Sequence, residues 1–305
     1  MFFDFNIPYP TSAADRVGFE NLKKIFAQLS QYRRGVVALN HTVTGKVSAS
    51  QVVYQYLDTI HIEILATNDV IYQTNPIQPV QTTSDIRQLT RLTVVADDVT
   101  HNYGLHSNNP TVNAFDLLAV RTSNEKVFAS ACANYEIDII SLECSSRLPF
   151  FLKNTTLGQA LDREVYFEIC YAGGIRGEYP LVASVNNFIG SNTCLSDPNA
   201  RRHLYNNAKR LVTVTKGKNI IFSSEALNAL EIRSPHDLIA FGISIGLNPE
   251  KAKNCITENC RKVLKRSETR RLTHKAVISV ASDTKIEGLN KRKAEEEQSA
   301  ESRKK

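Results

Sequence analysis

The stretch KGKNIIFSSEALNALEIRSP, residues 216–235, decides the fold. It places a short apolar run, Ile220 to Phe222, directly after a lysine-rich turn and before a pair of serines. An apolar run without alternating polar residues is typical of a strand covered on both faces, as in parallel sheets. Ser234 and Pro235 then supply the N-cap and the first-turn proline of a helix. The stretch is therefore interpreted as part of an alternating α/β fold.

The same pattern recurs along the chain, with helix-forming segments between most of the apolar runs. We expect about eight strands, at Phe2–Ile7, Gly35–Asn40, Leu89–Ala96, Phe115–Val120, Ile137–Leu142, Val165–Cys170, Asn219–Phe222 and Ala229–Ile232. Eight strands alternating with helices predict a TIM-type (β/α) barrel. Residues 224–228 are too short for a crossover helix between the last two strands, so either the closure is irregular or one of these assignments is wrong. An open, doubly wound sheet is the alternative.

Length and composition set the domain organisation. With 305 residues and 42% hydrophobic residues, the chain can bury a sizeable core. We expect a single α/β barrel domain over residues 1–280, with extra C-terminal helices and a surface insertion at about 42–88. Residues 281–305 are expected to form a disordered, charged tail, because the apolar periodicity ends there.

Other whole-chain features narrow the class of protein. No segment has the pattern of a signal peptide or the length of a membrane span, so we expect no membrane partner. The six cysteines are scattered without a CxxC pair, which indicates neither a zinc site nor a disulfide framework and favours a reducing compartment.

The charge is divided unevenly along the chain. Residues 1–200 contain 14 Lys and Arg against 19 Asp and Glu, whereas residues 201–275 contain 16 against 6. The second segment includes Arg201-Arg202, Lys209-Arg210 and a ridge in which Arg261 and Lys265 are four residues apart on one helix face. Acidic residues that normally intersperse such a face are scarce. This pattern indicates a polyanionic partner, and nucleic acid is the leading hypothesis.

Signatures of catalysis are weak. The residues expected at strand ends include His41, Asp97, Asp98 and Glu143, which motivate a metal-dependent phosphoesterase as the alternative function. However, the seven histidines form no HxH or HExxH motif, and the paired serines lack a GxSxG elbow. We therefore expect no cofactor, no metal and no catalytic residue. An ordinary metabolic barrel enzyme is a third possibility.

The C-terminal tail has the pattern of a nuclear-import signal. Two basic clusters are separated by a ten-residue spacer, as in bipartite signals. The clusters consist of Lys291, Arg292, Arg303, Lys304 and Lys305.

Several blocks of sequence resemble one known family, the barrel-shaped protein subunit shared by archaeal and eukaryotic ribonuclease P and, in eukaryotes, by ribonuclease MRP. The matching blocks are residues 3–7 (FDFNI), 38–41 (ALNH), 89–93 (LTRLT), 146–150 (SRLPF), 167–171 (FEICY), 216–219 (KGKN) and 230–235 (LEIRSP). The last block, with the serine pair before it, is the most specific. The resemblance extends over the whole predicted barrel and is weakest in the insertion.

The resemblance implies a fold and a function. The family is related to the polymerase-and-histidinol-phosphatase phosphoesterases, whose first strand carries an HxH metal motif; this chain has Asp4-Phe5-Asn6 there. The resemblance implies a non-catalytic RNA-binding subunit, with the phosphodiester chemistry done by the RNA. The implied roles are 5′ maturation of precursor tRNA by ribonuclease P and precursor rRNA processing by ribonuclease MRP.

The resemblance also implies partners and a location. The partners are ribonuclease P RNA, ribonuclease MRP RNA, precursor tRNA, a small ferredoxin-like protein subunit and the other protein subunits of these particles. The implied location is the nucleus and nucleolus. Carried onto this sequence, the residues expected to contact RNA are Arg91, Arg147, Lys153, Lys216, Lys218, Arg233, Arg270 and Arg271, through phosphate binding or stacking on bases.

Overall fold

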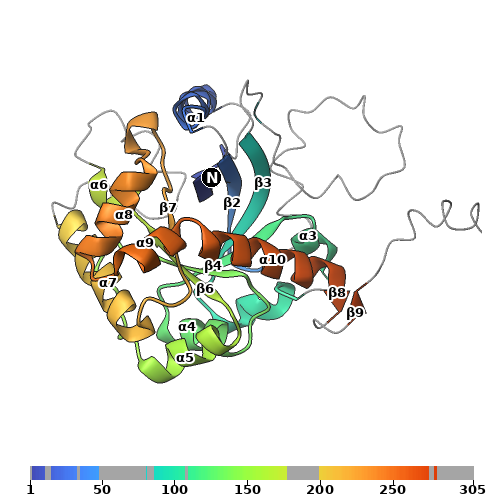
Figure 1. Cartoon of the computed structure of the whole chain (residues 1–305). Helices are drawn as coiled ribbons and strands as arrows, with labels where there is room; N and C mark the ends of the chain where they lie inside the picture. Colours follow the sequence, from blue (N-terminus) through green and yellow to red (C-terminus); the bar gives the residue numbers. More distant parts are fainter. Residues whose placement is uncertain are drawn as a thin grey trace, which may run out of the picture.

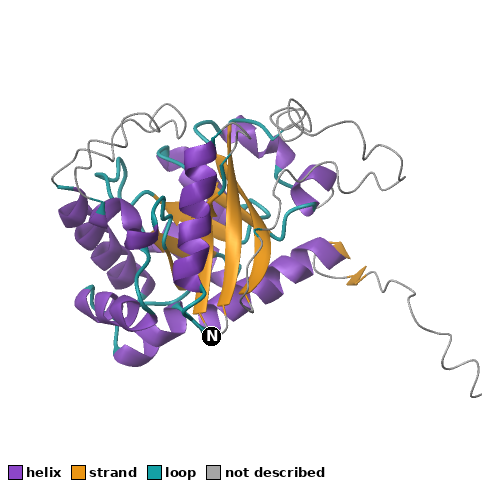
Figure 2. Ribbon diagram, turned by 90° about the horizontal axis from the view of Figure 1, so that it is seen from above, coloured by secondary structure: helices purple, strands orange, loops and turns teal. Residues whose placement is uncertain are grey.

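The computed structural model describes residues 2–10, 15–32, 35–47, 80, 86–106, 109–176, 199–274 and 278–279. Seven strands form one sheet, in the order β1-β2-β3-β4-β5-β6-β7, and every neighbouring pair is parallel. The sheet curls into a nearly closed TIM-like barrel that helices surround (Figures 1 and 2). The predicted fold class is therefore confirmed.

The strands match most of the apolar runs in the sequence. They are β1 (Phe2–Pro8), β2 (Gly35–Thr44), β3 (Ile86–Val95), β4 (Leu117–Arg121), β5 (Ile139–Leu142), β6 (Tyr166–Cys170) and β7 (Ile220–Ser223). Since β2 continues to Thr44 and β3 begins at Ile86, both strands reach into the insertion expected at 42–88. Residues 48–79 and 81–85 of that insertion lie outside the described residues.

The predicted eighth strand is wrong. Residues Ala229–Glu231 form a short 3₁₀ helix, η5. The carboxylate of Glu231 accepts hydrogen bonds from the backbone N–H of Leu227 at 2.8 Å and from the side chain of Arg176 at 3.0 and 3.1 Å. These bonds fix a tight turn where the intervening chain is too short for a parallel crossover.

The seam between β1 and β7 is closed by individual hydrogen bonds. The backbone N–H of Glu225 donates to the carbonyl of Asn6 at 2.8 Å, and that of Ser224 donates to Asp4 Oδ1 at 3.0 Å. Burial raises the pKa of the Asp4 carboxyl to about 6, although the hydrogen bonds from Ser224 and Asn6 act in the opposite direction. Asp4 and Asn6, the two polar positions of the first strand, therefore hold the barrel together.

The helices begin and end at residues that favour those positions. The elements around the strands are α1 (Arg16–Leu29), η3 (Val99–Gly104), α3 (Pro110–Asn113), α4 (Glu125–Ala133), α5 (Asn154–Asp162), α6 (Ala172–Ile175), α7 (Ala200–Thr215), α8 (Pro235–Ser244), α9 (Pro249–Cys255) and α10 (Glu258–Leu272), followed by the short pair β8 (Thr273–His274) and β9 (Ile278–Ser279). Ser234 and Asp237 form a capping box at the start of α8. Asn248 caps α9 ahead of Pro249.

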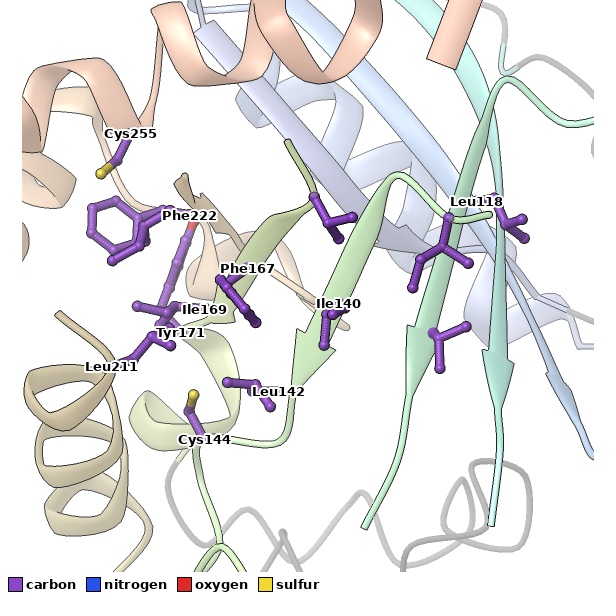
Figure 3. Close-up of a cluster of buried hydrophobic side chains, with 14 of the residues drawn as sticks. Leu118, Ile140, Leu142, Cys144, Phe167, Ile169, Tyr171, Leu211, Phe222 and Cys255 are labelled. Atoms are coloured by element: carbon purple, nitrogen blue, oxygen red, sulfur yellow. The ribbon is translucent and has the colours of Figure 1, made fainter. Parts of the chain in front are cut away.

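The core has two parts, one on each face of the sheet. Phe3, Ala38, Leu117 and Ile221 belong to the cluster inside the barrel, together with Val263 of α10. The larger cluster lies between the sheet and the outer helices. Figure 3 shows part of it, where Phe222 and Ile169 of the sheet gather with Leu211 of α7 and Cys255 of α9. These two apolar layers explain why the strands are apolar on both faces.

The helix α10 covers the amino-terminal ends of the strands. The side chain of Asn259 donates to the carbonyl of Ile220, where β7 begins, at 2.7 Å. Arg266 Nη2 donates to the carbonyl of Ile137, just ahead of β5, at 3.1 Å. Figure 1 shows α10 running across the strands. The helix therefore closes one end of the barrel.

Further expectations concern the cysteines, a membrane span and the division into barrel and tail. Cys132, Cys144, Cys170, Cys255 and Cys260 are buried and free. None of the helices in the described part of the chain is long and apolar enough to cross a membrane. The division into a barrel over 1–280 and a tail over 281–305 stays a prediction, since the tail lies outside the described residues.

Candidate nucleic-acid interface

An ion pair lies inside the barrel, between the middle of β3 and the middle of β6. The guanidinium of Arg91 donates to both carboxylate oxygens of Glu168, at 2.5 and 2.7 Å, and to the carbonyl of Phe5 at 2.8 Å. Neither side chain of the pair is exposed to solvent. Burial alone would raise the pKa of Glu168, but the charge and hydrogen bonds of Arg91 lower that pKa to about 2. The Glu168 carboxylate is therefore ionised at neutral pH.

Polar side chains around this ion pair bond to one another. Arg91 Nε donates to Thr93 Oγ1, whose hydroxyl donates to Asn40 Oδ1 at 2.7 Å. Asn40 Nδ2 in turn donates to Asn6 Oδ1 at 2.8 Å. Such a connected network satisfies its own donors and acceptors and leaves few for a ligand.

This geometry corrects one predicted RNA contact. Arg91 was expected to bind phosphate, but its side chain is 0% exposed and its guanidinium is already bonded within the barrel. The prediction for Arg91 is therefore wrong. Its position on β3 turns the side chain inward, because successive residues of a strand face opposite sides.

A second arginine blocks the mouth of the barrel. Arg121, at the end of β4, donates to Glu225 at 2.6 Å and to Ser141 at 3.1 Å, and it lies 3.5 Å from Glu143. The Glu143 and Glu225 carboxylates therefore share one guanidinium group, that of Arg121.

The residues proposed for a metal site do not gather at one place. The His41 ring stacks on Phe115 with centroids 6.4 Å apart, while Asp98 accepts a hydrogen bond from the backbone of Thr100 at the start of η3. Glu143 lies against Arg121 instead. Among the residues that the structure describes, no group of three or more His, Cys, Asp or Glu is arranged to hold a metal ion.

His41 is also unusual in its burial. Neither ring nitrogen has a hydrogen-bond partner within the described chain, and the residue is fully enclosed. This burial lowers the pKa of the imidazole from 6.5 to about 4. The ring therefore stays neutral at physiological pH.

Most inward basic residues of α10 are tied to the barrel. Arg270 forms an ion pair with Asp138 at 3.0 Å, and Arg271 pairs with Asp116 at 2.8 Å. The side chain of Arg270 is only 7% exposed, whereas that of Arg271 is 28% exposed. Both arginines lie where they anchor α10 to the residues that precede β5 and β4. Their predicted contact with RNA stays a prediction, and little of Arg270 is available for it.

The outer face of α7 has a different arrangement. Arg201, Arg202, Lys209 and Arg210 are all exposed, and the helix contains no Asp or Glu. Its apolar side, with Leu204, Ala208 and Leu211, is buried against the barrel. The exposed surface of the helix therefore carries cations near its start and in its second half, and no carboxylate on the helix opposes them. We call this surface the α7 face, defined by these four basic residues.

The predicted contacts Lys216 and Lys218 lie just beyond this helix and are exposed. Lys216 is the C-cap of α7 in a left-handed conformation, with φ of 54°, and Gly217 follows at φ of 70°. These two residues turn the chain from α7 into β7. They extend the basic surface of α7 towards the start of the next strand.

An exposed aromatic ring lies beside the α7 face. Phe151 is 70% exposed, and the guanidinium of Arg210 lies 4.6 Å from its ring centroid. The predicted contacts Arg147 and Lys153 come from the same loop after β5 and are also exposed; Lys153 pairs with Glu125 at 2.7 Å. An exposed ring beside arginine is the arrangement on which unpaired bases stack. The sequence does not indicate Phe151 as a contact residue, because an aromatic residue in an apolar block is typical of the buried core.

The remaining predicted residues are distributed elsewhere. Arg233 is half-buried after η5, and its backbone N–H donates to the hydroxyl of Tyr171 at 3.3 Å. The import-signal residues Lys291, Arg292, Arg303, Lys304 and Lys305 lie outside the described residues. The sequence shows the four basic residues of α7 as part of a basic segment but does not single them out as RNA contacts. The signal for them is the absence of Asp and Glu from residues 199–218.

Fold and surface together define a class of protein: a TIM-like α/β barrel whose interior is sealed by its own ion pairs and whose exposed α7 face is cationic. A family model described as RNase P subunit p30 matches residues 1–272. The chain belongs to this family.

Individual relatives agree with this assignment. The chain is 31% identical to "Ribonuclease P protein subunit p30" of Mus musculus over 80% of both chains. It is 24% identical to "Ribonuclease P/MRP protein subunit RPP1" of Saccharomyces cerevisiae, over 91% of this chain and 84% of that one. It is 30% identical to "Protein GAMETOPHYTE DEFECTIVE 1" of Arabidopsis thaliana over 92% of this chain, but it spans only 46% of that longer relative.

A solved structure shares the fold. A chain in the cryo-EM structure of archaeal ribonuclease P with mature tRNA superposes with a TM-score of 0.54. The match covers 93% of this chain and 99% of that chain, at 13% identity. The expected resemblance to the ribonuclease P barrel subunit is therefore confirmed in sequence and in fold.

Proposed function

We propose that this chain is a non-catalytic, RNA-binding subunit of ribonuclease P, acting in 5′ maturation of precursor tRNA, and of ribonuclease MRP, acting in precursor rRNA processing. The α7 face is the observation that carries the RNA-binding part. Four exposed cations on an acid-free helix attract the phosphate backbone, because each neutralised phosphate releases counterions. The family assignment and the name of the yeast relative support the two particles.

The non-catalytic part of the proposal follows from the barrel interior. Enzymes with this fold place reacting groups at the carboxyl ends of the strands. Here Arg121, at the end of β4, is paired with Glu225, and the Arg91–Glu168 pair lies further inside the barrel, so these charges are matched within the protein. The phosphodiester chemistry is therefore assigned to the RNA subunit, with this chain as a scaffold.

Recovery of the tagged full chain from its own cells tests this function. Sequencing of the copurified RNA should return ribonuclease P RNA and ribonuclease MRP RNA, with precursor tRNA as a minor species. A variant with Arg201, Arg202, Lys209 and Arg210 all changed to Gln should lose most of this RNA. Recovery of only one of the two RNAs would remove the other particle from the proposal.

Catalysis is tested with the purified chain alone. Incubated with precursor tRNA and Mg²⁺, it should leave the 5′ leader attached, whereas the assembled particle should remove it. Cleavage by the chain alone, abolished by EDTA, would overturn the non-catalytic role.

We place the small ferredoxin-like subunit against α1 and η5. These elements contact one another, and they expose Val17 and Leu230, of which Leu230 is 84% exposed. Exposed apolar side chains on elements that contact one another favour binding of another protein there. Leu230→Glu should reduce copurification of the small subunit while RNA binding by the isolated chain is unchanged. An unaltered yield of the small subunit would refute this position.

The nucleus and nucleolus are the proposed location, since the basic clusters of the tail match an import signal. Replacing Lys291, Arg292, Arg303, Lys304 and Lys305 by Ala should move a fluorescent fusion of the full chain to the cytoplasm. Unchanged nuclear fluorescence would contradict the assignment of the signal to these residues.

A further inference from the structure

A pocket of about 340 Å³ opens where α7 ends and the turn between α8 and α9 passes over it. Its floor is apolar and includes Val212, Ile245 and Leu247. Three lysines line it: Lys209 and Lys216 near the end of α7, and Lys251 of α9. No Asp or Glu is among its lining residues. An apolar floor whose only charged neighbours are cations suits a ligand with one flat apolar part and one anionic part.

The walls of the pocket are held in place by direct contacts. The ammonium of Lys251 donates to the carbonyl of Lys216 at 2.7 Å, which joins α9 to the end of α7. A Cβ added to Gly217 would lie 2.6 Å from Leu247 Cδ2, so the turn after α7 packs tightly against the floor. A pocket built from such contacts needs little rearrangement on binding, which lowers the entropy lost by the complex.

The pocket is continuous with the proposed RNA-binding surface. Lys209 belongs both to the α7 face and to the pocket lining. A strand whose phosphates follow the α7 face would therefore reach the pocket at the end of the helix. The volume lies within the range of sites for small organic ligands, which begins at about 300 Å³.

We infer that this pocket binds a single unpaired nucleotide of the RNA partner, with the base on Val212, Ile245 and Leu247 and the adjacent phosphates at Lys209 and Lys216. The inference rests on the proposed RNA-binding function. A base within a duplex is stacked and paired, and extracting it costs a few kcal/mol. The pocket consequently selects single-stranded over double-stranded segments, which the charge of the α7 face alone does not.

The test uses variants that distinguish the effect of filling the pocket from the effect of removing a positive charge. Thr213 is exposed and lines the pocket, so Thr213→Trp places an indole in it without changing the net charge. Ala27→Trp, at an exposed position of α1, is the matched control for added bulk. Lys209→Gln removes a lining cation, and Lys253→Gln removes an exposed cation of α9 that does not line the pocket.

Binding is measured by fluorescence anisotropy with the full chain. The probes are an eight-nucleotide oligouridylate and a short RNA duplex with the same number of phosphates. Thr213→Trp should weaken oligouridylate binding about tenfold, the effect expected for loss of one base contact, and duplex binding less than twofold. Ala27→Trp and Lys253→Gln should change oligouridylate binding less than twofold. Thermal unfolding verifies that each variant is folded.

Several outcomes would overturn the inference. Equal weakening of both probes by Thr213→Trp would show a general charge or stability effect, and no weakening of either would show an unused pocket. Displacement of oligouridylate by an oligoglutamate peptide at comparable concentration would assign the pocket to an acidic protein segment. In each case, loss of ribonuclease P RNA binding by the four-residue α7 variant would still support the proposed function. If that variant also binds normally, both proposals fail.

Discussion

The helices α7 and α10 have similarly basic sequences but opposite uses for their charge. On α7, Arg201, Arg202, Lys209 and Arg210 point to solvent. On α10, Arg270 and Arg271 are paired with Asp138 and Asp116. Arg266 is also held, by backbone carbonyls at the bottom of the barrel. The cations of α7 are exposed, whereas Arg266, Arg270 and Arg271 of α10 bond to the barrel.

This difference shows that the number of basic residues in a segment does not measure the charge available to a ligand. An arginine that is desolvated and paired with a carboxylate contributes to stability or specificity of the fold and little to an external field. Arg91 is the extreme case, since it is fully enclosed with Glu168. The comparison therefore predicts that changes at the paired arginines of α10 act on folding, and that changes at the exposed cations of α7 act on RNA binding.

The largest effect is expected from breaking the α10 anchor. Arg270→Met leaves the carboxylate of Asp138, which is 0% exposed, without its cation. Removing one partner of a buried pair costs about 3–5 kcal/mol, so urea unfolding should show a loss of that size. Arg261→Met is the control on the same helix, because the Arg261–Glu258 pair is about half exposed at 56% and 48%. Its loss should stay below about 1 kcal/mol; equal losses would contradict a special role for Arg270.

Acid is expected to destabilise the barrel through His41. His41 has a pKa lowered to about 4, so the folded state resists the proton that the unfolded chain accepts near 6.5. Stability is therefore unaffected above pH 6.5 and falls as the pH drops towards 4, by up to about 3 kcal/mol.

The variant His41→Leu isolates this contribution. The difference in unfolding free energy between the variant and the wild type should grow in favour of the variant from pH 6.5 to 4. This comparison removes the opposing effect of Asp4, whose pKa is raised to about 6 and which stabilises the fold as the pH falls through that value. A difference that does not vary with pH would refute the assignment to His41.

The two basic surfaces can be compared directly in RNA affinity. The first variant has Gln in place of Arg201, Arg202, Lys209 and Arg210. It should bind ribonuclease P RNA on the order of tenfold to a hundredfold more weakly. The plot of the logarithm of the association constant against the logarithm of salt concentration should also become less steep, by up to about 3. The exposed α10 residues Arg261, Lys262 and Lys265, changed to Gln, serve as the control and should have a smaller effect on both quantities. A larger effect from the α10 set would move the interface to α10.

The smallest effect is expected at the aromatic ring beside α7. Phe151→Ala removes a ring that is 70% exposed, so stability should change little. Loss of base stacking should weaken single-stranded RNA binding by about 1 kcal/mol, roughly fivefold. Phe151→Tyr keeps a ring and should retain the wild-type affinity. If both variants bind equally well, the ring does not contact RNA.

Local patterns predicted much of the fold. Runs such as Ile220–Phe222 become strands because only a doubly covered strand buries every side chain, and Ser234-Pro235 begins α8 because its capping groups are local. The false eighth strand arose because Ala229–Ile232 is apolar, although Glu231 within it bonds to Arg176, far away in sequence. For the site, Lys216 and Lys218 are exposed and their contact with RNA stays a prediction, whereas Arg91 was not recognised as core.

The sequence by itself determined the alternation of strands and helices, the family and the basic character of residues 201–275, since each depends on neighbouring residues or on composition. Only the tertiary structure decided which cations face solvent. Asp138 lies 132 residues from Arg270, and Glu168 lies 77 from Arg91. The barrel brings each carboxylate to its arginine across a long stretch of sequence. The cations of α7 are not part of these pairs and stay exposed.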